Sequence, residues 1–100
     1  MNVLITARKF KARASLKDFI TNEVESLKKY NNDILTADVV LSFQNSRESI
    51  KTAEITIHVP GQTLFAEEKS DEFEKSINSS VEKLTRQLKK LKTKRTARSK

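Results

Sequence analysis

A buried strand and its turn can be recognised in the stretch Ala53-Glu54-Ile55-Thr56-Ile57-His58-Val59-Pro60-Gly61. Apolar and polar side chains alternate along it, which is the period of a strand that has one face on a core. Pro60 suits the first central position of a type II turn, and Gly61 supplies the positive φ of the second. We therefore expect residues 63–66 to return antiparallel to this strand.

Two more strands are predicted upstream. The same alternation runs from Ala37 to Phe43, and the polar residues 44–49 would join these two strands as a hairpin loop. Residues 1–6 are β-branched and apolar enough for a short first strand. The sheet would thus have four strands.

A first helix is predicted between strands one and two. Ser15 would cap it, with Asp18 three residues later, and Asn31-Asn32 would allow a left-handed stop after Tyr30. Its apolar positions recur at three- and four-residue steps. They are Leu16, Phe19, Ile20, Val24 and Leu27.

A second helix is predicted from Ser70, which would cap it, with acidic residues in the first turn where the helix dipole favours them. Its apolar stripe comprises Phe73, Ile77, Val81, Leu84, Leu88 and Leu91. A cationic flank lies well away from this stripe and comprises Lys83, Gln87, Lys90 and Lys94, with Arg86 beside them. The apolar period ends at Leu91, so we expect one domain over residues 1–92 and a disordered basic tail over residues 93–100.

The order β-α-β-β-β-α predicts an α+β fold. It would be a two-layer sandwich in which a four-stranded mixed sheet carries both helices on one face. The helices must share a face because the other sides of the strands carry polar residues such as Asp38, Glu54 and His58.

Charge is distributed unevenly along this chain of net charge +7. Acids outnumber bases in residues 31–70, whereas the end of the chain has no acid after Glu82. The bases there are Lys83, Arg86, Lys89, Lys90, Lys92, Lys94, Arg95, Arg98 and Lys100. This pattern favours a polyanion partner, and a rigid cationic helix suits the shape and phosphates of RNA.

The remaining composition argues against other classes of function. The five phenylalanines fall mostly on predicted core positions, which would leave no stacking platform on the sheet. With no cysteine and a lone His58, we expect no metal site, no cofactor and no enzyme activity. No apolar run is long enough for a signal peptide or a membrane span, so we expect a cytoplasmic protein without a small-molecule substrate.

A family signature can be recognised in the run Glu82-Lys83-Leu84-Thr85-Arg86-Gln87-Leu88-Lys89-Lys90-Leu91-Lys92. It resembles the Asp/Glu-Lys-Leu-x-Arg-Gln-Leu-x-Lys pattern of the ribosome hibernation promoting factor family, which includes protein Y. Residues 5–8, 16–20, 53–61 and 64–68 are similar to other segments of that family, as is Tyr30. The resemblance covers almost the whole chain. It implies a short-form member with a fold related to double-stranded-RNA-binding domains.

The resemblance also implies a function. Such a protein would bind the rRNA of the small ribosomal subunit near the decoding region, block the mRNA and tRNA sites, and inhibit translation in idle ribosomes during stationary phase or stress. It would be a monomer when free. The RNA-binding residues would be Lys83, Arg86, Gln87, Lys89, Lys90 and Lys92, together with Lys94, Arg8, Lys28 and Lys29.

Some family positions differ in this chain, and two other functions remain open. A Lys-x-x-Lys pair of the family's first helix aligns with Glu23 and Ser26, and Lys28 and Lys29 would partly replace it. Charge and fold alone would also suit a generic double-stranded RNA-binding protein. A third hypothesis is an assembly protein whose basic face meets an acidic protein.

Overall fold

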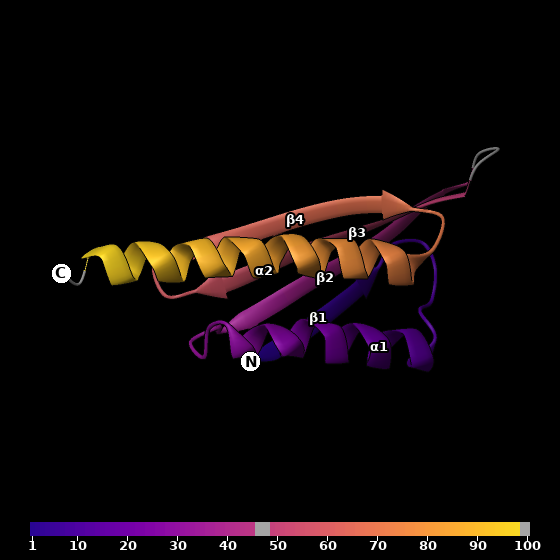
Figure 1. The fold of residues 1–100 in the computed structure, drawn as a ribbon. Coiled ribbons are helices and arrows are strands. Elements are labelled where there is room, and N and C mark those ends of the chain that lie inside the picture. Colours follow the sequence, from indigo (N-terminus) through magenta and orange to yellow (C-terminus); the bar gives the residue numbers. More distant parts are fainter. Residues whose placement is uncertain (46–48, 99–100) are drawn as a thin grey trace.

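The computed structural model describes the backbone of residues 1–45 and 49–98, and the side chains of residues 1–44 and 50–91. Two helices, a short 3₁₀ helix and four strands follow one another along the chain (Figure 1). They are β1 (Asn2–Ala7), α1 (Ala14–Glu25), η1 (Ser26–Lys29), β2 (Thr36–Asn45), β3 (Ser49–Val59), β4 (Gln62–Ser70) and α2 (Phe73–Arg98). The predicted order β-α-β-β-β-α is confirmed.

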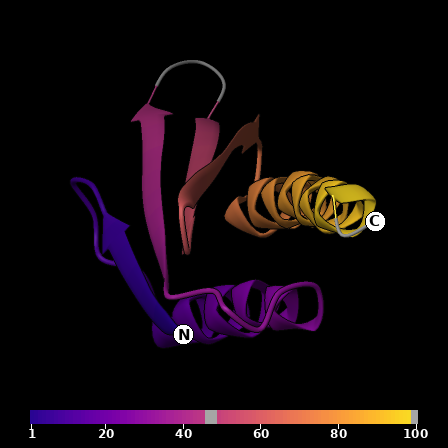
Figure 2. The ribbon, with the colours of Figure 1, turned by 90° about the vertical axis from the view of Figure 1, so that its left-hand side faces the viewer.

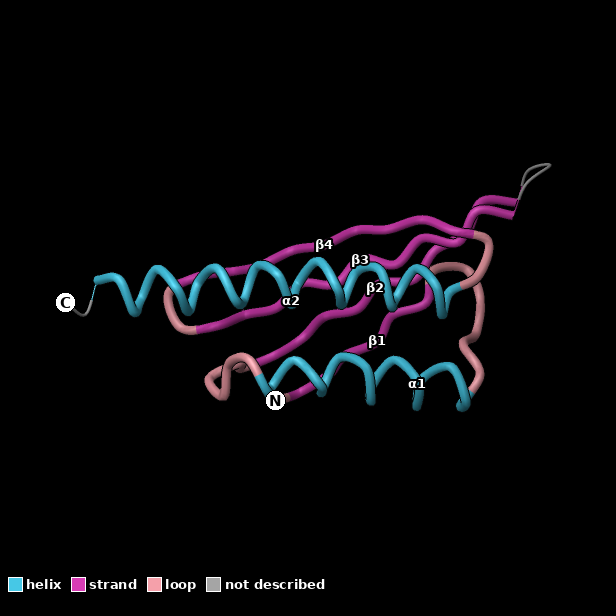
Figure 3. Tube along the Cα trace, viewed as in Figure 1, coloured by secondary structure: helices cyan, strands magenta, loops and turns pink. Residues whose placement is uncertain are grey.

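The strands form one mixed sheet in the order β1-β2-β3-β4. β1 runs parallel to β2, and the other neighbours are antiparallel, as the path of the chain in Figure 3 makes visible. Leu41 pairs with Ala7 on one side and Ala53 on the other, so the apolar positions of adjacent strands are in register. The same register places their polar positions together on the opposite face.

Both hairpins form, with longer strands than the sequence predicted. Gly61 has a φ of +77°, and Val59 pairs with Gln62, so Pro60-Gly61 makes the expected two-residue turn. β4 continues through residues 67–70 because these polar residues keep pairing with β3. β2 and β3 pair as far as Asn45 and Ser49, and residues 46–48 of the other predicted hairpin loop lie outside the described residues.

The two helices cover one face of the sheet (Figure 2). Along β2, the buried residues Ala37, Val39 and Leu41 alternate with partly exposed ones, and β3 and β4 follow the same pattern. Ile20 on α1 and Leu84 on α2 are fully buried in the same core cluster as the strand residues. Burying a side chain of this size contributes about 1.5–3 kcal/mol, so this layer supplies much of the stability.

α1 begins two residues earlier than a cap at Ser15 would place it. Its N-cap is Arg13, which makes no side-chain capping bond, and the first helical hydrogen bond runs from Lys17 N to Arg13 O over 3.0 Å. Ser15 therefore lies inside the first turn, where its hydroxyl cannot reach the orphan N–H groups as a cap would. The predicted capping box of Ser15 and Asp18 is wrong.

The end of this helix also differs from the prediction. The α-helix ends at Glu25 and tightens into η1, which closes with Tyr30 N donating to Leu27 O over 3.0 Å. Among the described non-glycine residues only Lys9 has a positive φ, so the predicted left-handed stop at Asn31-Asn32 is wrong. A 3₁₀ turn satisfies terminal carbonyls without any left-handed residue.

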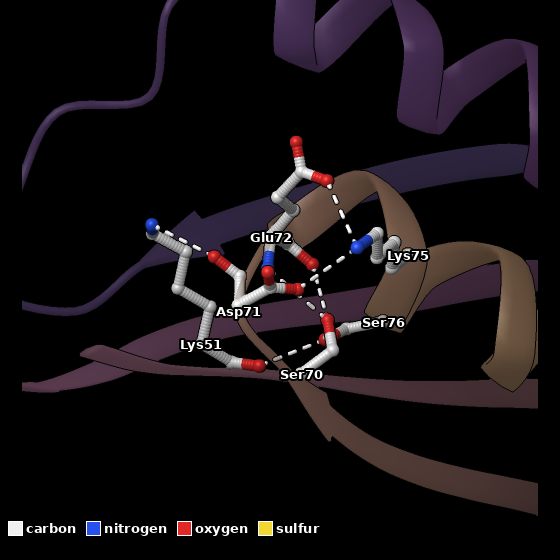
Figure 4. A network of polar contacts seen from close by, with 6 residues as sticks. All are labelled: Lys51, Ser70, Asp71, Glu72, Lys75 and Ser76. Carbon is white, nitrogen blue, oxygen red and sulfur yellow. Dashed lines mark hydrogen bonds and ion pairs between the residues drawn. The ribbon is translucent and has the colours of Figure 1, made fainter. Parts of the chain in front are cut away.

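A polar network joins β3, β4 and the start of α2 (Figure 4). The predicted cap Ser70 is the last residue of β4, and its Oγ accepts a hydrogen bond from Glu72 N over 3.2 Å. Ser76 N donates to Glu72 O over 3.1 Å, so the helix starts at Phe73, later than predicted, with the Ser70 hydroxyl holding the turn before it. Ser76 Oγ donates to Lys51 O on β3 over 2.8 Å. The network thus anchors the first turn of α2 to the sheet.

Two small buried residues let α2 lie close to β3. Ser76 and Ser80 are one helical turn apart and fully buried. Ser80 Oγ donates to Ala53 O over 3.4 Å, which repeats one turn later the bond that Ser76 makes to β3. Each hydroxyl donates a hydrogen bond to a strand carbonyl, so neither is a buried polar group without a partner, which would be costly.

The far end of α2 continues past the apolar stripe. Its backbone is helical to Arg98, although the apolar period ends at Leu91. The side chains beyond Leu91 lie outside the described residues. The division into a domain of residues 1–92 and a disordered tail of residues 93–100 stays a prediction.

Truncating the α2 stripe should destabilise the protein strongly. Leu84 is 0% exposed and Leu88 1%, so Leu84→Ala or Leu88→Ala should each lower the free energy of unfolding by about 2–5 kcal/mol through lost burial and a cavity. Urea unfolding followed by circular dichroism measures this. The exposed Arg86→Ala is the control on the same helix, and an equal loss there would contradict the assignment of the buried face.

Candidate RNA-binding surface

The side chains of α2 point in three directions, toward the core, toward β4 and toward Tyr30. Leu84 and Leu88 point into the core. Lys83 and Gln87 contact β4, and Lys89 lies against Tyr30 just after η1. Lys89 thus points away from the predicted cationic flank, of which Lys83 and Gln87 lie against β4.

Two residues of the predicted cationic flank bind the edge of the sheet. Lys83 Nζ lies 3.0 Å from Glu68 Oε2, and Gln87 Nε2 donates to Phe65 O over 3.0 Å. β4 is an edge strand, so a carbonyl that accepts from α2 points away from β3. Gln87 thus occupies part of an edge that would otherwise be open to pairing with another chain.

Arg86 and Lys90 are exposed near that contact, and Lys90 lines a cavity with Gln87 beside β4. Arg86 Nη2 lies 3.0 Å from Glu82 Oε1 one turn before it, and both side chains are about two thirds exposed, at 67% and 68%. An exposed pair of this kind contributes only about 0.3–0.5 kcal/mol, so Arg86 can exchange its partner for a phosphate at little cost. Lys90 is exposed.

More cations come from the end of the first helix. Lys28 and Lys29 are exposed on η1, and Lys89 Nζ stands 5.5 Å from the centre of the Tyr30 ring. Lys29 and Tyr30 also line a cavity with Leu88 and Leu91 of α2. η1 and the second half of α2 therefore present their cations on neighbouring parts of one side of the molecule.

Of the remaining predicted site residues, Arg8 is not part of this arrangement. Arg8 follows β1, and its charge acts on Glu54, which lies on the open face of the sheet away from the helices. The side chains of Lys92 and Lys94 lie outside the described residues.

Glu23 and Ser26, which the family resemblance aligns with a pair of lysines, bring no positive charge. Both are partly buried, and Ser26 Oγ donates to Glu23 O over 2.5 Å. This bond belongs to the junction of α1 and η1. It leaves Lys28 and Lys29 as the exposed cations of that segment.

The open face of the sheet is polar and partly acidic. His58 Nε2 lies 3.2 Å from Asp38 Oδ2 on the neighbouring strand. Glu54 and Glu67 lie directly opposite each other on β3 and β4. No group of three or more metal-ligating side chains is gathered among the described residues.

One of the two opposed carboxyl groups titrates abnormally. A hydrogen bond with Glu67 raises the pKa of Glu54 above its ordinary value of 4.5, and partial burial and the charge of Glu67 act in the same direction. The charge of Arg8 partly opposes this rise. Two carboxylates this close cannot both ionise freely.

The aromatic side chains correct one expectation. Phe65 is 52% exposed on the open face, because Leu64 and Ala66 are the β4 residues that turn toward the core. Phe10 stacks on Phe73 at 5.2 Å and meets Phe43, 38% exposed, edge to face at 5.5 Å. The expected core placement is therefore wrong for Phe65, although a single ring is not a multi-base platform.

Tyr30 is the residue whose role the sequence did not suggest. The sequence marked it only as the end of a helix and as a position of the family resemblance, without a contact. In the structure it is a partly buried ring between η1 and α2, next to a cavity and a lysine. The available signal was an aromatic residue followed by a run of polar residues at a helix end.

Removing the Gln87 amide should weaken the fold measurably. Gln87→Ala deletes a hydrogen bond to an edge carbonyl, so we expect the free energy of unfolding to fall by about 1 kcal/mol. Lys90→Ala, one turn away and exposed, is the matched control. Equal stability of both variants in urea would contradict a sheet-anchoring role for Gln87.

Because Glu54 and Glu67 are opposed, replacing one of them should change the stability by an amount that depends on pH. A raised pKa in the folded state means that protonated Glu54 favours folding, and this contribution is lost as pH rises through the raised pKa. Glu67→Gln should therefore raise the free energy of unfolding at pH 7, and the gain should shrink below about pH 4. Glu25→Gln, exposed on α1, is the control. A gain that does not depend on pH would rule out carboxylate repulsion as its cause.

The chain is similar to known proteins over nearly its whole length. Residues 3–96 match the family described as sigma 54 modulation protein / S30EA ribosomal protein. The N-terminal domain of protein Y from Thermus thermophilus superposes with a TM-score of 0.81 at 26% identity, over 91% of this chain and 99% of that domain. A ribosomal subunit interface protein from Coxiella burnetii shares the fold with a TM-score of 0.84 at 19% identity, over 93% and 99% of the two chains.

These likenesses confirm the predicted α+β fold and the family resemblance noted in the sequence. None of the described helices has an apolar stretch long enough to cross a bilayer. The match extends over nearly the whole sequence, from β1 into the last turns of α2. The chain therefore belongs to the sigma 54 modulation protein / S30EA ribosomal protein family, the family of the ribosome hibernation factors.

Proposed function

We propose that this chain is a ribosome hibernation factor that binds the rRNA of the small ribosomal subunit through one surface. This surface, the helical cationic surface, consists of Arg86, Lys89 and Lys90 of α2 and Lys28 and Lys29 of η1. It lies at the helical layer, whereas the open sheet face carries the opposed carboxyl groups Glu54 and Glu67. This separation of charge is the observation that carries the proposal.

Binding through such a surface is a matter of phosphates and shape. Each cation that neutralises a phosphate releases counterions, so affinity should fall steeply with salt. A-form RNA hides its base edges in a deep major groove, so a rigid helical surface meets mainly backbone oxygens. Arg86 is suited to this because its surface partner is weakly held and its guanidinium binds phosphate in a bidentate manner.

The residues that the sequence predicted to bind RNA have different roles in this proposal. Lys83 lies at the border of the surface, where its pairing with Glu68 leaves it 48% exposed. The side chains of Lys92 and Lys94 lie outside the described residues, so their contacts with RNA stay a prediction. Gln87 acts through the fold by holding α2 to β4. Arg8 is left out, because its charge acts on Glu54 on the open face.

The inhibition that we propose is steric. A domain bound near the decoding region occupies the space of mRNA and tRNA, so an idle ribosome is kept from initiating without any chemical step. The chain acts in the cytoplasm as a monomer before it binds. Its partner is the ribosome, and it needs no cofactor or substrate.

The test compares two pairs of substitutions that remove the same charge. Arg86→Ala with Lys90→Ala should weaken co-sedimentation with small subunits and lower the slope of log affinity against log salt by about 2. Arg8→Ala with Lys69→Ala removes two cations from the open-face side and should leave binding nearly unchanged. An equal loss from both pairs would show that net charge, not the helical cationic surface, drives binding.

Competition by an arbitrary RNA duplex separates ribosome binding from general RNA binding. A hibernation factor should stay on small subunits when a large excess of duplex is added. Release at equal phosphate concentrations would overturn the proposed function in favour of a generic double-stranded RNA-binding protein.

A further inference from the structure

A cavity at the end of η1 adds a feature that cationic contacts alone do not explain. It has a volume of about 330 Å³. One wall is formed by residues 29–33, which leave η1, and the other by Leu88 and Leu91 of α2. This size lies within the range of about 300–1,000 Å³ that is usual for small-ligand sites.

The cavity continues toward the turn between β3 and β4. A second cavity of about 160 Å³ shares Asn31, Asp33 and Leu91 with the first and reaches Pro60 and Gly61. The two together form a recess between the end of the first helix, the second half of α2 and one hairpin turn. A flat group that enters the first cavity therefore has further space beside it.

The lining combines an aromatic ring with groups that can bind the edge of a base. Tyr30 is partly buried at the cavity. Asn31 Oδ1 accepts a hydrogen bond from Asp33 N over 2.8 Å, which holds the turn in shape and leaves the amide nitrogen of Asn31 as the donor for a ligand. Asn32 and Asp33 are exposed at the same wall, and their side chains add acceptors.

Positive charge stands at the mouth of the recess. Lys89 Nζ lies above the Tyr30 ring, 5.5 Å from its centre, and Lys29 is part of the lining. A nucleotide whose base enters the cavity would bring its phosphate near these two ammonium groups. Stacking on an aromatic ring combined with edge hydrogen bonds is the usual way in which proteins hold an unpaired base of RNA.

We propose that this recess binds one unpaired nucleobase of the RNA, stacked on Tyr30. The inference rests on the proposed function, since it assigns a base contact to the same side of the molecule. It adds a base contact to a surface that otherwise reaches only phosphates. The bound base would come from a loop or bulge, because a paired base is not available for stacking.

Tyr30 is the only tyrosine of a chain without tryptophan, so its ring reports on the recess directly. The full chain is titrated with adenosine 5′-monophosphate while the ring resonances of Tyr30 are followed by NMR. We expect a saturable upfield shift from the ring current of the base. Ribose 5-phosphate, which lacks the base, should not cause it. No shift with the nucleotide, or an equal shift with the sugar phosphate, would overturn the inference.

Variants test whether the recess contributes on the ribosome. Tyr30→Leu should weaken small-subunit binding about tenfold, as expected for one lost base stack, whereas Tyr30→Phe keeps the ring and should stay within about twofold. Phe43→Leu removes a partly exposed ring outside the recess and should match the wild type. Thermal unfolding of each variant checks that the fold is intact.

The outcomes separate this inference from the proposed function. In one outcome the wild type binds small subunits, Tyr30→Leu binds equally well, and the nucleotide causes no shift. The recess is then not a base site, although the chain is a ribosome-binding protein. If the chain does not bind small subunits but the nucleotide shifts Tyr30 and ribose 5-phosphate does not, the proposed function fails while the base site stands.

Discussion

The packing of the α2 stripe on the sheet is the contact on which the rest of the structure depends. Ile77, Leu84 and Leu88 are fully or almost fully buried against the layer of β3 and β4. Since successive residues of a helix are 100° apart, fixing these three also fixes the direction of every cation on α2. The helix cannot rotate to gather its positive charges without exposing leucines, so the proposed RNA-binding surface is a consequence of the core.

Polar contacts along the helix reinforce this orientation. Ser76 and Ser80 bind carbonyls of β3, and further along Gln87 binds the outer edge of β4. Each bond is modest, but together they hold α2 along most of its described side-chain length. The run of residues 82–92 therefore combines two kinds of residue, those that hold the helix to the sheet and those that are exposed for the proposed contact with RNA.

Much of the fold could be predicted from the sequence because its signals are local. The alternation in β2 and β3, the Pro60-Gly61 turn and the stripe of α2 each depend on neighbours a few residues away. The start of α1 was misplaced because its N-cap is Arg13, which makes no side-chain capping bond. The partial exposure of Phe65 was missed because Leu64 and Ala66 compete for the core at the adjacent positions.

The candidate site was less predictable because it depends on contacts between distant segments. Glu68 is 15 residues from Lys83, and the carbonyl of Phe65 is 22 residues from Gln87. Charge and helical angle identified both α2 residues, but only the fold shows what they bind. The recess beside Tyr30 likewise exists only where η1 meets α2.

The central claim is that the helical side, not the open sheet, faces the RNA of the small subunit. The chain has no cysteine, so a single one can be introduced and linked to an iron chelate that cleaves nearby RNA. A probe at Glu82→Cys, exposed on α2 one turn before Arg86, should cut small-subunit rRNA at a few positions, whereas a probe at Thr56→Cys, on the open face, should cut little. Stronger cleavage from position 56 than from position 82 would contradict the account.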